Sequence, residues 1–425
     1  MRSDPYPLIH LEPWGIISFA YQGDKQIEYF VREEEKIPQR MKHTFLFPHF
    51  FSTVSPQLKI QIEKVRVFLE SEYSARCCLV GGAVRDRLLG RPVKDLDIEV
   101  YGLDPETFAE AMARLGASGV GKSFFVYKYG DLDIALPRRE KKVGRGHRGF
   151  VVEPARDERE ASRRRDFTVN ALMYDLRSER IVDYWRGLED LRAKRLRRVD
   201  PKTFVEDSLR VLRAMQFAAR LGFRVEEETC RLCRRIPLDD LPGSRIFGEF
   251  EKMFTAERPH YGLYALETLE ISRRLWGKGL KSGAFVRAAR AMARRIPAAP
   301  EPMRPYCFLA LYAQYSPVPM SEILEAIDAP NRYRRLLEAL PKVPPNPTPA
   351  FVADCARKTG LKESPLSCFP SVRRIAQRLG IWERPFEIGV SPRELMERGF
   401  SGKALGEELE RIRRRKLAAL ERKEP

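Results

Sequence analysis

The chain has 425 residues, a length that predicts about two to four domains. Lysine and arginine outnumber the acidic residues by 77 to 59, which leaves a net charge of +18. Such an excess favours a polyanionic partner, usually nucleic acid, although a solvated arginine-rich surface explains charge alone equally well. The seven cysteines are scattered and odd in number, so no disulfide framework is expected. Because no signal peptide and no long apolar run is found, we expect a cytoplasmic protein without a membrane anchor.

The first 55 residues mix aromatic and charged side chains without a clear period. They are interpreted as an N-terminal extension of unknown role, either an extra module or a poorly ordered tail. From Pro56 to Glu72 the apolar positions recur at helical spacing, which predicts an amphipathic helix. The first globular domain is therefore expected to begin at residue 56.

Residues 79–101 read LVGGAVRDRLLGRPVKDLDIEVY and form the most informative stretch. A buried strand is predicted at Cys77–Val80, followed by a break at Gly81 and Gly82 and one or two helical turns over Arg85–Leu89. A second strand is predicted over Val93–Tyr101, where apolar and polar residues alternate.

Asp95 and Asp97 are two residues apart, so on a strand both carboxylates point to one face. Glycines allow close approach of a backbone, and amides at a helix start favour an anion. A phosphate cradle that faces a carboxylate pair suits metal-assisted nucleotidyl transfer, in which Mg²⁺ ions bridge carboxylates and phosphates. Either piece alone is usually just a turn or an exposed strand.

Together the pieces form the string GGxVRDxLLGRxxxDxD. It resembles the signature of the polymerase-β-like nucleotidyltransferases, in the branch that holds the bacterial CCA-adding enzymes and poly(A) polymerases. The resemblance implies that Asp95 and Asp97 hold two Mg²⁺ ions, and that Gly81, Gly82 and Arg85 hold the nucleotide triphosphate. It also implies an α+β fold: an N-terminal nucleotidyltransferase domain with a small mixed sheet and flanking helices, followed by an all-α neck, body and tail.

Further along, a helix is predicted at Pro105–Leu115. Two strands are then predicted at Val120–Phe125 and Val126–Pro137, with Tyr129 and Gly130 as the break. The context of Asp133 resembles the family's third carboxylate, which would help deprotonate the attacking hydroxyl; the alternative is a surface position. The charged stretch Glu140–Ser162 is predicted to be a solvated loop, and His147 a loop residue. In the family the corresponding loop helps the enzyme move from C addition to A addition.

Residues 163–171 read RRRDFTVNA, a string nearly diagnostic of the same branch. The resemblance makes Arg165 a nucleotide contact and Asp166 a contact to the sugar. The alternative is an N-capping aspartate after a basic loop. A strand, a helix and a strand over Ile181–Val199 are expected to close the catalytic domain, which would span residues 56–199.

A long helix is predicted over Phe204–Leu221, with Asp200 and Pro201 as start signals and Gly222 as its end. On a helical wheel its charged residues share one sector and its apolar residues the other. The charged sector holds Glu206, Asp207, Arg210 and Arg213; the apolar sector holds Phe204, Val205, Leu212, Met215 and Ala219.

Cytosine and adenine both present an amino donor beside a ring-nitrogen acceptor, which an aspartate acceptor and an arginine donor would match. Asp207 and Arg210 supply such a pair, and Glu206 could hold the guanidinium of Arg210. The string EDxxRxxR resembles the family's amino-acid template, which adds Arg213 as a further nucleotide contact. The alternative is an exposed salt-bridge ladder.

The remainder is predicted to be helical, with a neck at 200–270, a body at 271–340 and a tail at 341–425. The last helix carries a basic run at 411–416 that could bind an RNA backbone or simply face solvent. In the family the tail binds the tRNA acceptor and T arms by shape. No obligatory protein partner is expected.

The sequence therefore predicts an RNA nucleotidyltransferase that adds CCA to the 3′ end of tRNA from CTP and ATP and releases pyrophosphate. The rivals are A-only or CC-only addition, a poly(A) polymerase and a non-catalytic RNA-binding protein. The carboxylates argue against the last, and residues 122–127, KSFFVY, resemble the CCA-adding version of that segment. The loop after Glu140 argues against CC-only addition.

Overall fold

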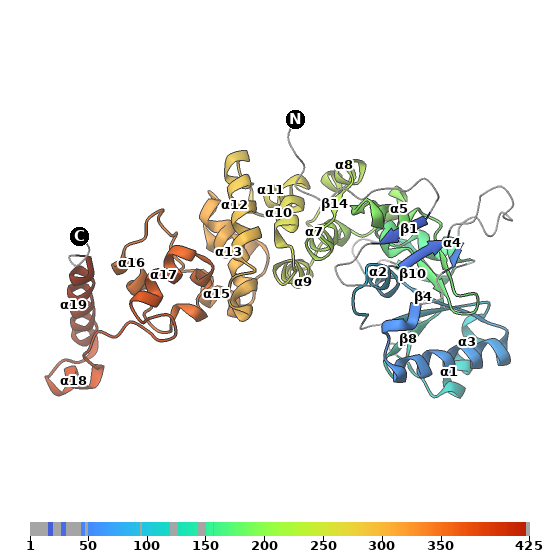
Figure 1. The fold of residues 1–425 in the computed structure, drawn as a ribbon, viewed down its shortest axis with the longest axis horizontal. Helices are drawn as coiled ribbons and strands as arrows, with labels where there is room; N and C mark the ends of the chain where they lie inside the picture. The colour runs from blue at the N-terminus through green and yellow to red at the C-terminus, as the bar shows by residue number, and fades with distance from the viewer. Residues whose placement is uncertain are drawn as a thin grey trace. The chain divides into compact units, whose positions relative to one another are not determined.

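The computed structural model describes residues 16–19, 27–30, 44–46, 50–93, 96–119, 126–142, 150–155 and 157–421. The chain divides into two compact units, Met1–Asp207 and Ser208–Pro425. Figure 1 draws both, and each is described by itself below.

The N-terminal unit is built on a mixed sheet, which in the described residues has the strand order β3-β12-β11-β4-β5-β8-β7-β6. Its strands are β3 (Thr44–Leu46), β4 (Arg76–Val80), β5 (Leu96–Tyr101), β6 (Ser118–Gly119), β7 (Val126–Tyr129), β8 (Leu132–Ala135), β11 (Met173–Asp175) and β12 (Arg180–Val182). All neighbours pair antiparallel except β5 and β8, which are parallel. The predicted small mixed sheet is confirmed.

Helices flank this sheet, as predicted (Figure 1). They are α1 (Pro56–Tyr73), α2 (Gly82–Leu88), α3 (Pro105–Leu115), α4 (Glu158–Arg163), α5 (Gly187–Arg192) and α6 (Pro201–Phe204), with the short 3₁₀ helices η3 (Phe50–Thr53) and η4 (Thr168–Asn170). The start of α1 is fixed by Ser55, whose hydroxyl accepts the Leu58 N–H at 3.3 Å. On β5 the alternation predicted for this strand holds for its apolar residues, because Leu96, Ile98 and Val100 are buried.

Part of the predicted N-terminal extension belongs to this unit. Strand β3 pairs with β12 at one edge of the sheet. The ring of Phe50 is fully buried and stacks on Tyr174 at a centroid distance of 4.2 Å. Two further strands, β1 (Ile16–Phe19) and β2 (Ile27–Phe30), pair antiparallel with each other.

The segment after β8 corrects one expectation. Strand β9 (Arg138–Lys142) pairs antiparallel with β10 (Phe150–Pro154), and α4 follows, so much of the predicted solvated loop is ordered structure. Phe150, Val151 and Val152 are consecutive residues with high strand propensity. The charged residues on either side of them favoured the prediction of a loop instead. His147 and the predicted strand at 120–125 lie outside the described residues.

The C-terminal unit is helical apart from the two-residue strand β14 (Arg224–Val225), which agrees with the predicted all-α remainder (Figure 1). Its first helices are α7 (Leu209–Leu221), α8 (Glu227–Arg235), α9 (Gly243–Phe254), α10 (Pro259–Thr268), α11 (Ile271–Trp276), α12 (Ser282–Arg295), α13 (Arg304–Tyr315), α14 (Met320–Ala326) and α15 (Asn331–Leu337). There follow α16 (Pro349–Cys355), α17 (Pro370–Arg378), α18 (Pro392–Glu397) and α19 (Gly402–Glu421), with 3₁₀ turns η5 (Glu301–Met303), η6 (Leu361–Glu363) and η7 (Pro365–Cys368). Helix α18 begins with a capping box formed by Ser391 and Glu394.

The predicted continuous helix over 204–221 is wrong. Helix α6 ends at Phe204, and α7 begins only at Leu209, after a turn. The Ser208 hydroxyl donates to Asp240 at 2.6 Å, and short polar residues such as Asp207 and Ser208 favour helix boundaries over helix interiors. Val205, predicted to be part of the core, is 42% exposed because it lies in this turn.

None of the helices in the described ranges combines the length and apolar character needed to cross a bilayer. The seven cysteines are all free thiols, and six of them are buried.

Candidate active site

Two of the predicted carboxylates lie side by side in the sheet. Asp97 on β5 and Asp133 on β8 are register partners in the parallel pair, so their Cα atoms are about 4.8 Å apart and their side chains share a face. Asp97 is exposed, and the Asp133 side chain is 43% exposed. Lys128 on β7 approaches Asp133 with an Nζ–Oδ1 distance of 3.4 Å.

Asp95, the other predicted metal ligand, lies outside the described residues. Within the described ranges no group of three or more His, Cys, Asp or Glu side chains is close enough to hold a metal ion. The two described carboxylates nevertheless fit a hard divalent cation, because such ions take oxygen ligands and readily keep several waters.

Glu99 lies two residues after Asp97 and faces the same side of β5, but it is buried. Its carboxylate accepts a hydrogen bond from Nη2 of Arg165 at 2.8 Å and one from the Tyr101 hydroxyl at 2.7 Å. Arg164 lies 3.7 Å from the same carboxylate oxygen. One face of β5 thus carries the exposed Asp97 beside the buried Glu99, which is hydrogen-bonded to Arg165.

These charges shift the titration of the cluster. Burial by itself would raise the pKa of Glu99, but Arg165 and then Arg164 outweigh it and hold the pKa below its ordinary value. For Arg165 burial works toward a lower pKa, yet Glu99, Tyr101 and Asp97 keep the pKa raised. The acid stays an anion and the guanidinium stays a cation at neutral pH.

Gly81 brings the backbone against this guanidinium. Its φ of +72° is one that residues with a side chain rarely adopt. A Cβ at this position would lie 2.8 Å from Nη1 of Arg165. Gly81 follows Val80, the register partner of Asp97, so the glycine turn, Arg165 and Asp97 meet at one point of the sheet.

Arg85 is placed differently from Arg165. It is 2% exposed, and its guanidinium binds Asp86 through Nε and Nη2, each at 2.8 Å. Its Nη1 donates to the side chain of Asn170. Gly82 lies beside this guanidinium, since a Cβ there would be 3.5 Å from Nη2. Arg85, a predicted triphosphate contact, therefore already has hydrogen-bond partners within the protein.

Asp166 completes a buried chain of polar contacts. Its carboxylate accepts from the Phe167 N–H at 2.7 Å and from the Asn170 amide at 2.9 Å. Thr168 holds the same turn by donating to the buried Asp190 at 2.6 Å. Both aspartates thus fix the η4 turn that presents Asn170 to Arg85.

The predicted template residues lie around the turn that precedes α7. Glu206 and Asp207 are in the turn, so the helical spacing used to place them beside Arg210 does not apply. Arg210 is in the first turn of α7 and is partly exposed. Arg213 packs over the ring of Phe217, with 5.1 Å between its Cζ and the ring centroid.

Sequence reasoning missed three residues of this site: Glu99, Lys128 and Asn170. Glu99 could have been predicted, because alternate residues of a strand share one face and Glu99 follows Asp95 and Asp97 at the same spacing of two. The position of Lys128 beside Asp133 depends on strand register, and that of Asn170 beside Arg85 depends on the η4 turn. Neither can be inferred from the sequence.

Two regions of the chain match known families. Residues 77–197 match the family described as Poly A polymerase head domain, and residues 222–276 match one described as a probable RNA and SrmB binding site of polymerase A. The first region contains Gly81, Asp97, Glu99, Asp133 and Arg165, whereas the predicted template residues at 206–213 lie between the two matched regions.

Curated relatives resemble part of the chain. A multifunctional CCA protein of Stenotrophomonas maltophilia is 46% identical over 193 residues, which are 43% of this chain and 46% of that protein. A multifunctional CCA protein of Xylella fastidiosa is 40% identical over 203 residues, 45% of this chain and 47% of that protein. The chain thus spans about half the length of the curated relatives it matches.

Solved structures share the fold over a longer range. A CCA-adding enzyme in an apo form has a TM-score of 0.63 at 24% identity and covers 89% of this chain and 96% of its own. A tRNA nucleotidyltransferase complexed with a primer tRNA and an incoming ATP analog has a TM-score of 0.50 at 26% identity, over 63% of this chain and 80% of its own. The head-domain match places residues 77–197 in that family, and the solved structures show that the chain shares the fold of a CCA-adding enzyme over most of its length.

Proposed function

We propose that this protein is a cytoplasmic tRNA nucleotidyltransferase that adds C, C and A to the 3′ end of tRNA from CTP and ATP. The observation that carries the proposal is the pairing of Asp97 with Asp133 on parallel strands beside the Gly81 turn and Arg165. An exposed carboxylate pair next to a buried cation at a glycine turn is suited to a metal-bound triphosphate. The multifunctional CCA relatives support the substrate class.

The metal is proposed to be Mg²⁺, as two ions held by Asp97 and by Asp95. When bound, the ions would lower the pKa of the attacking 3′-hydroxyl and neutralise the departing pyrophosphate. Asp133 would accept the proton of that hydroxyl, since it lies in register with Asp97 and is open to solvent. Its contact to Lys128 would orient the carboxylate without burying it.

Arg165 and Arg85 would act on the triphosphate from different positions. Arg165 lies against the Gly81 backbone, so its guanidinium can present free N–H groups where a phosphate would approach the glycines. Its Nε is buried and makes no hydrogen bond to the described protein. Arg85 is held by Asp86 and Asn170 and would supply positive charge from behind the turn.

Selection between nucleotides would belong to Asp207 and Arg210, with Arg213 as a further contact and Glu206 as support. An Asp acceptor and an Arg donor match cytosine and adenine but not uracil and guanine. The acceptor and T arms of tRNA would bind basic surface through shape and backbone contacts.

Poly(A) polymerase activity and A-only or CC-only addition are the rival functions within the family. Ordered strands β9 and β10 border residues 143–149, so the segment whose shortening would favour CC-only addition is retained in this chain. Poly(A) synthesis would predict repeated A addition to any RNA, whereas the proposed enzyme should stop after one A.

The test uses the full chain and a single carboxylate. Asp97→Asn should abolish nucleotide incorporation into tRNA while tRNA binding stays within about twofold, because the carboxylate serves the metal and the RNA contacts lie elsewhere. Asp131→Asn is the matched control, since this exposed aspartate lies in the β7–β8 turn two residues before Asp133. Normal incorporation by Asp97→Asn would refute the proposed site.

A further inference from the structure

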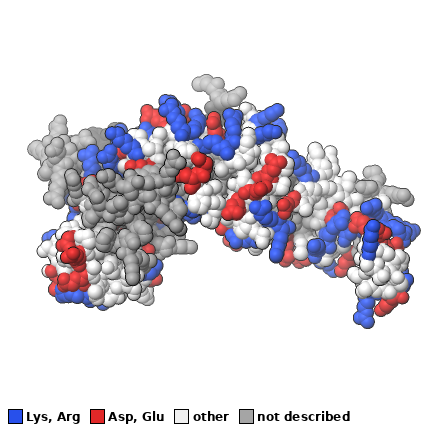
Figure 2. Space-filling model, turned by 180° about the vertical axis from the view of Figure 1, so that it is seen from behind, with Lys and Arg blue, Asp and Glu red and all other residues white. Residues whose placement is uncertain are grey.

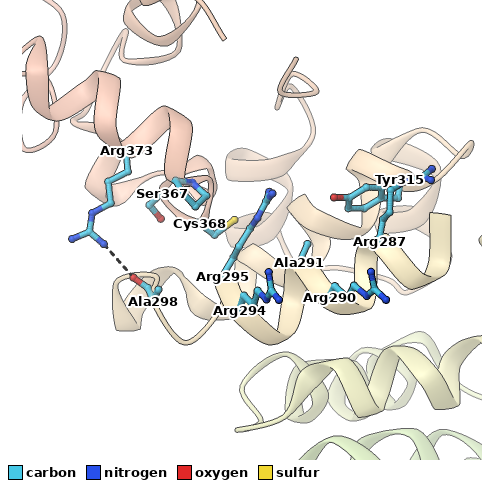
Figure 3. A pocket seen from close by; sticks show the side chains of 11 residues that line it. Arg287, Arg290, Ala291, Arg294, Arg295, Ala298, Tyr315, Ser367, Cys368 and Arg373 are labelled. Carbon is cyan, nitrogen blue, oxygen red and sulfur yellow. Dashed lines mark hydrogen bonds between the residues drawn. The ribbon is translucent and has the colours of Figure 1, made fainter. Parts of the chain in front are cut away.

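An arginine-lined cavity lies within the C-terminal unit, between α12 and the η7–α17 segment. Its volume is about 560 Å³. Figure 3 shows four arginines along α12 and Arg373 from α17. The lining consists of Arg287, Arg290, Ala291, Arg294, Arg295, Ala298, Tyr315, Ser367, Cys368, Pro370 and Arg373.

The positive charge of this cavity is not balanced by neighbouring acids. Neither α12 nor α17 contains an aspartate or a glutamate. Within the described part of the chain, none of the five lining arginines lies in an ion pair. The basic run of α19 differs, because Arg411 pairs with Glu408 at 2.6 Å and Arg414 approaches Glu410 at 3.7 Å.

Two of the arginines are held in place by aromatic rings. The guanidinium of Arg295 lies over Phe369 at 5.3 Å, and that of Arg373 lies over Trp382 at 5.2 Å. Arg373 also donates to the Ala298 carbonyl at 3.4 Å (Figure 3). Stacking fixes a guanidinium plane while leaving N–H donors for a ligand.

The cavity also contains a buried hydroxyl group that lacks a hydrogen-bond acceptor in the described part of the chain. Ser367 is 3% exposed and lines the cavity, yet its Oγ has no hydrogen-bond partner among the described residues. Buried polar groups in folded proteins are normally paired. An anionic oxygen in the cavity would accept this hydroxyl together with the arginine N–H groups.

We propose that this cavity binds the phosphodiester backbone of the RNA substrate. From Arg287 to Arg295 the helix rises about 12 Å, so the row is matched to more than one phosphate. The lining offers no acidic and no amide side chain to read a base edge, which favours sequence-independent backbone contacts. This inference rests on the proposed tRNA substrate and names one of its binding sites.

The test compares two double variants of the full chain. Arg290→Gln with Arg294→Gln removes two exposed charges from the cavity, and glutamine keeps the helix propensity of α12. Lys278→Gln with Arg335→Gln removes the same charge from exposed positions of the same unit, one after α11 and one on α15, which lie outside the cavity and outside the matched region 222–276. Affinity for a stem RNA with a single-stranded 3′ end is measured by fluorescence anisotropy over a series of salt concentrations.

The cavity variant should lose about two units of the slope of log affinity against log salt, since each phosphate contact contributes roughly one. At 0.1 M salt this corresponds to an affinity loss of roughly tenfold to a hundredfold. The control variant should keep the wild-type slope. Equal slopes for both variants would overturn the proposal. So would a loss of inorganic tripolyphosphate binding by the cavity variant with RNA binding unchanged.

Nucleotide incorporation separates this inference from the proposed function. If the wild-type protein binds the RNA but incorporates nothing, the proposed activity fails, whereas the slopes still report on the cavity. If incorporation proceeds, the cavity variant should show a raised KM for RNA with kcat little changed.

Discussion

Glu99 and Asp97 share one face of β5 but differ in their exposure to solvent. Asp97 is exposed, whereas Glu99, two residues later, is buried between Arg165 and the Tyr101 hydroxyl. A buried charge pair of this kind is costly to break from one side, because the remaining charge is left without a partner. We therefore propose that Glu99 positions Arg165.

We expect Glu99→Gln to destabilise the protein by roughly 3 to 5 kcal/mol near neutral pH. It should also raise the KM for CTP and ATP about tenfold or more, because Arg165 is no longer held at the Gly81 turn, while RNA affinity stays unchanged. Denaturant unfolding and steady-state kinetics measure the two effects. A stability loss without any change in nucleotide KM would show that Glu99 is merely structural.

The pH dependence of this stability difference has a definite sign. The pKa of Glu99 is lowered in the folded protein, so its contribution is present above the unfolded value of about 4.3 and is lost as the pH falls through the folded pKa. The difference in unfolding free energy between wild type and Glu99→Gln should thus shrink below about pH 4. A difference that grows on acidification would contradict the assignment of an ionised Glu99.

At the scale of elements, alternation and helical spacing predict several strands and helices of the N-terminal unit, because they record which face is buried. The mixed sheet itself was implied by the family resemblance. Helix α3 has the predicted bounds, and α1 differs from its prediction by one residue. The helix over 204–221 could not be predicted, because the turn before α7 is set by the contact of Ser208 with Asp240, which is 32 residues away. Likewise, the neighbour relation of Asp97 and Asp133 depends on strand order, which the spacing of the two residues does not reveal.

The template residues give a prediction for this turn. Asp207→Ala should lower catalytic efficiency with CTP and ATP and narrow their advantage over UTP and GTP, by roughly tenfold to a hundredfold. Residual incorporation should persist, since the proposed metal-binding carboxylates are untouched. Asp239→Ala, at an exposed position in the C-terminal unit, should leave the order of the four nucleotides unchanged. Unaltered selectivity in Asp207→Ala would favour the salt-bridge alternative.

The end of α7 gives a stability prediction with an internal control. Gly222 has φ of +71°, and a Cβ there would lie 2.5 Å from the Arg258 guanidinium. Gly222→Ala should therefore destabilise the C-terminal unit by about 1 to 2 kcal/mol. Gly406→Ala, within α19 and with no atom near its Cβ position, should be neutral or stabilising by up to about 1 kcal/mol. Thermal unfolding compares the two, and a neutral Gly222→Ala would argue against the left-handed helix end.

For the whole molecule, charge alone does not identify the RNA-binding surface. On the face drawn in Figure 2, basic and acidic side chains are interspersed over the described residues. The net charge of +18 therefore does not locate an RNA-binding surface. Clusters of arginines without acidic partners in the described ranges, such as the one in the cavity beside α12, are better candidates. We propose that this chain extends tRNA by C, C and A at the site of Asp97 and Asp133.

The most direct test supplies the full-length protein with Mg²⁺, each labelled nucleotide in turn, and tRNA that ends at the discriminator base, at -C or at -CC. CTP should extend the first tRNA by two residues and the second by one. ATP should add a single residue only to the tRNA that ends in -CC. UTP and GTP should be poor substrates, and Asp97→Asn should be inactive with all four. Repeated A addition to every RNA, or ATP incorporation alone, would show that the chain is not a CCA-adding enzyme.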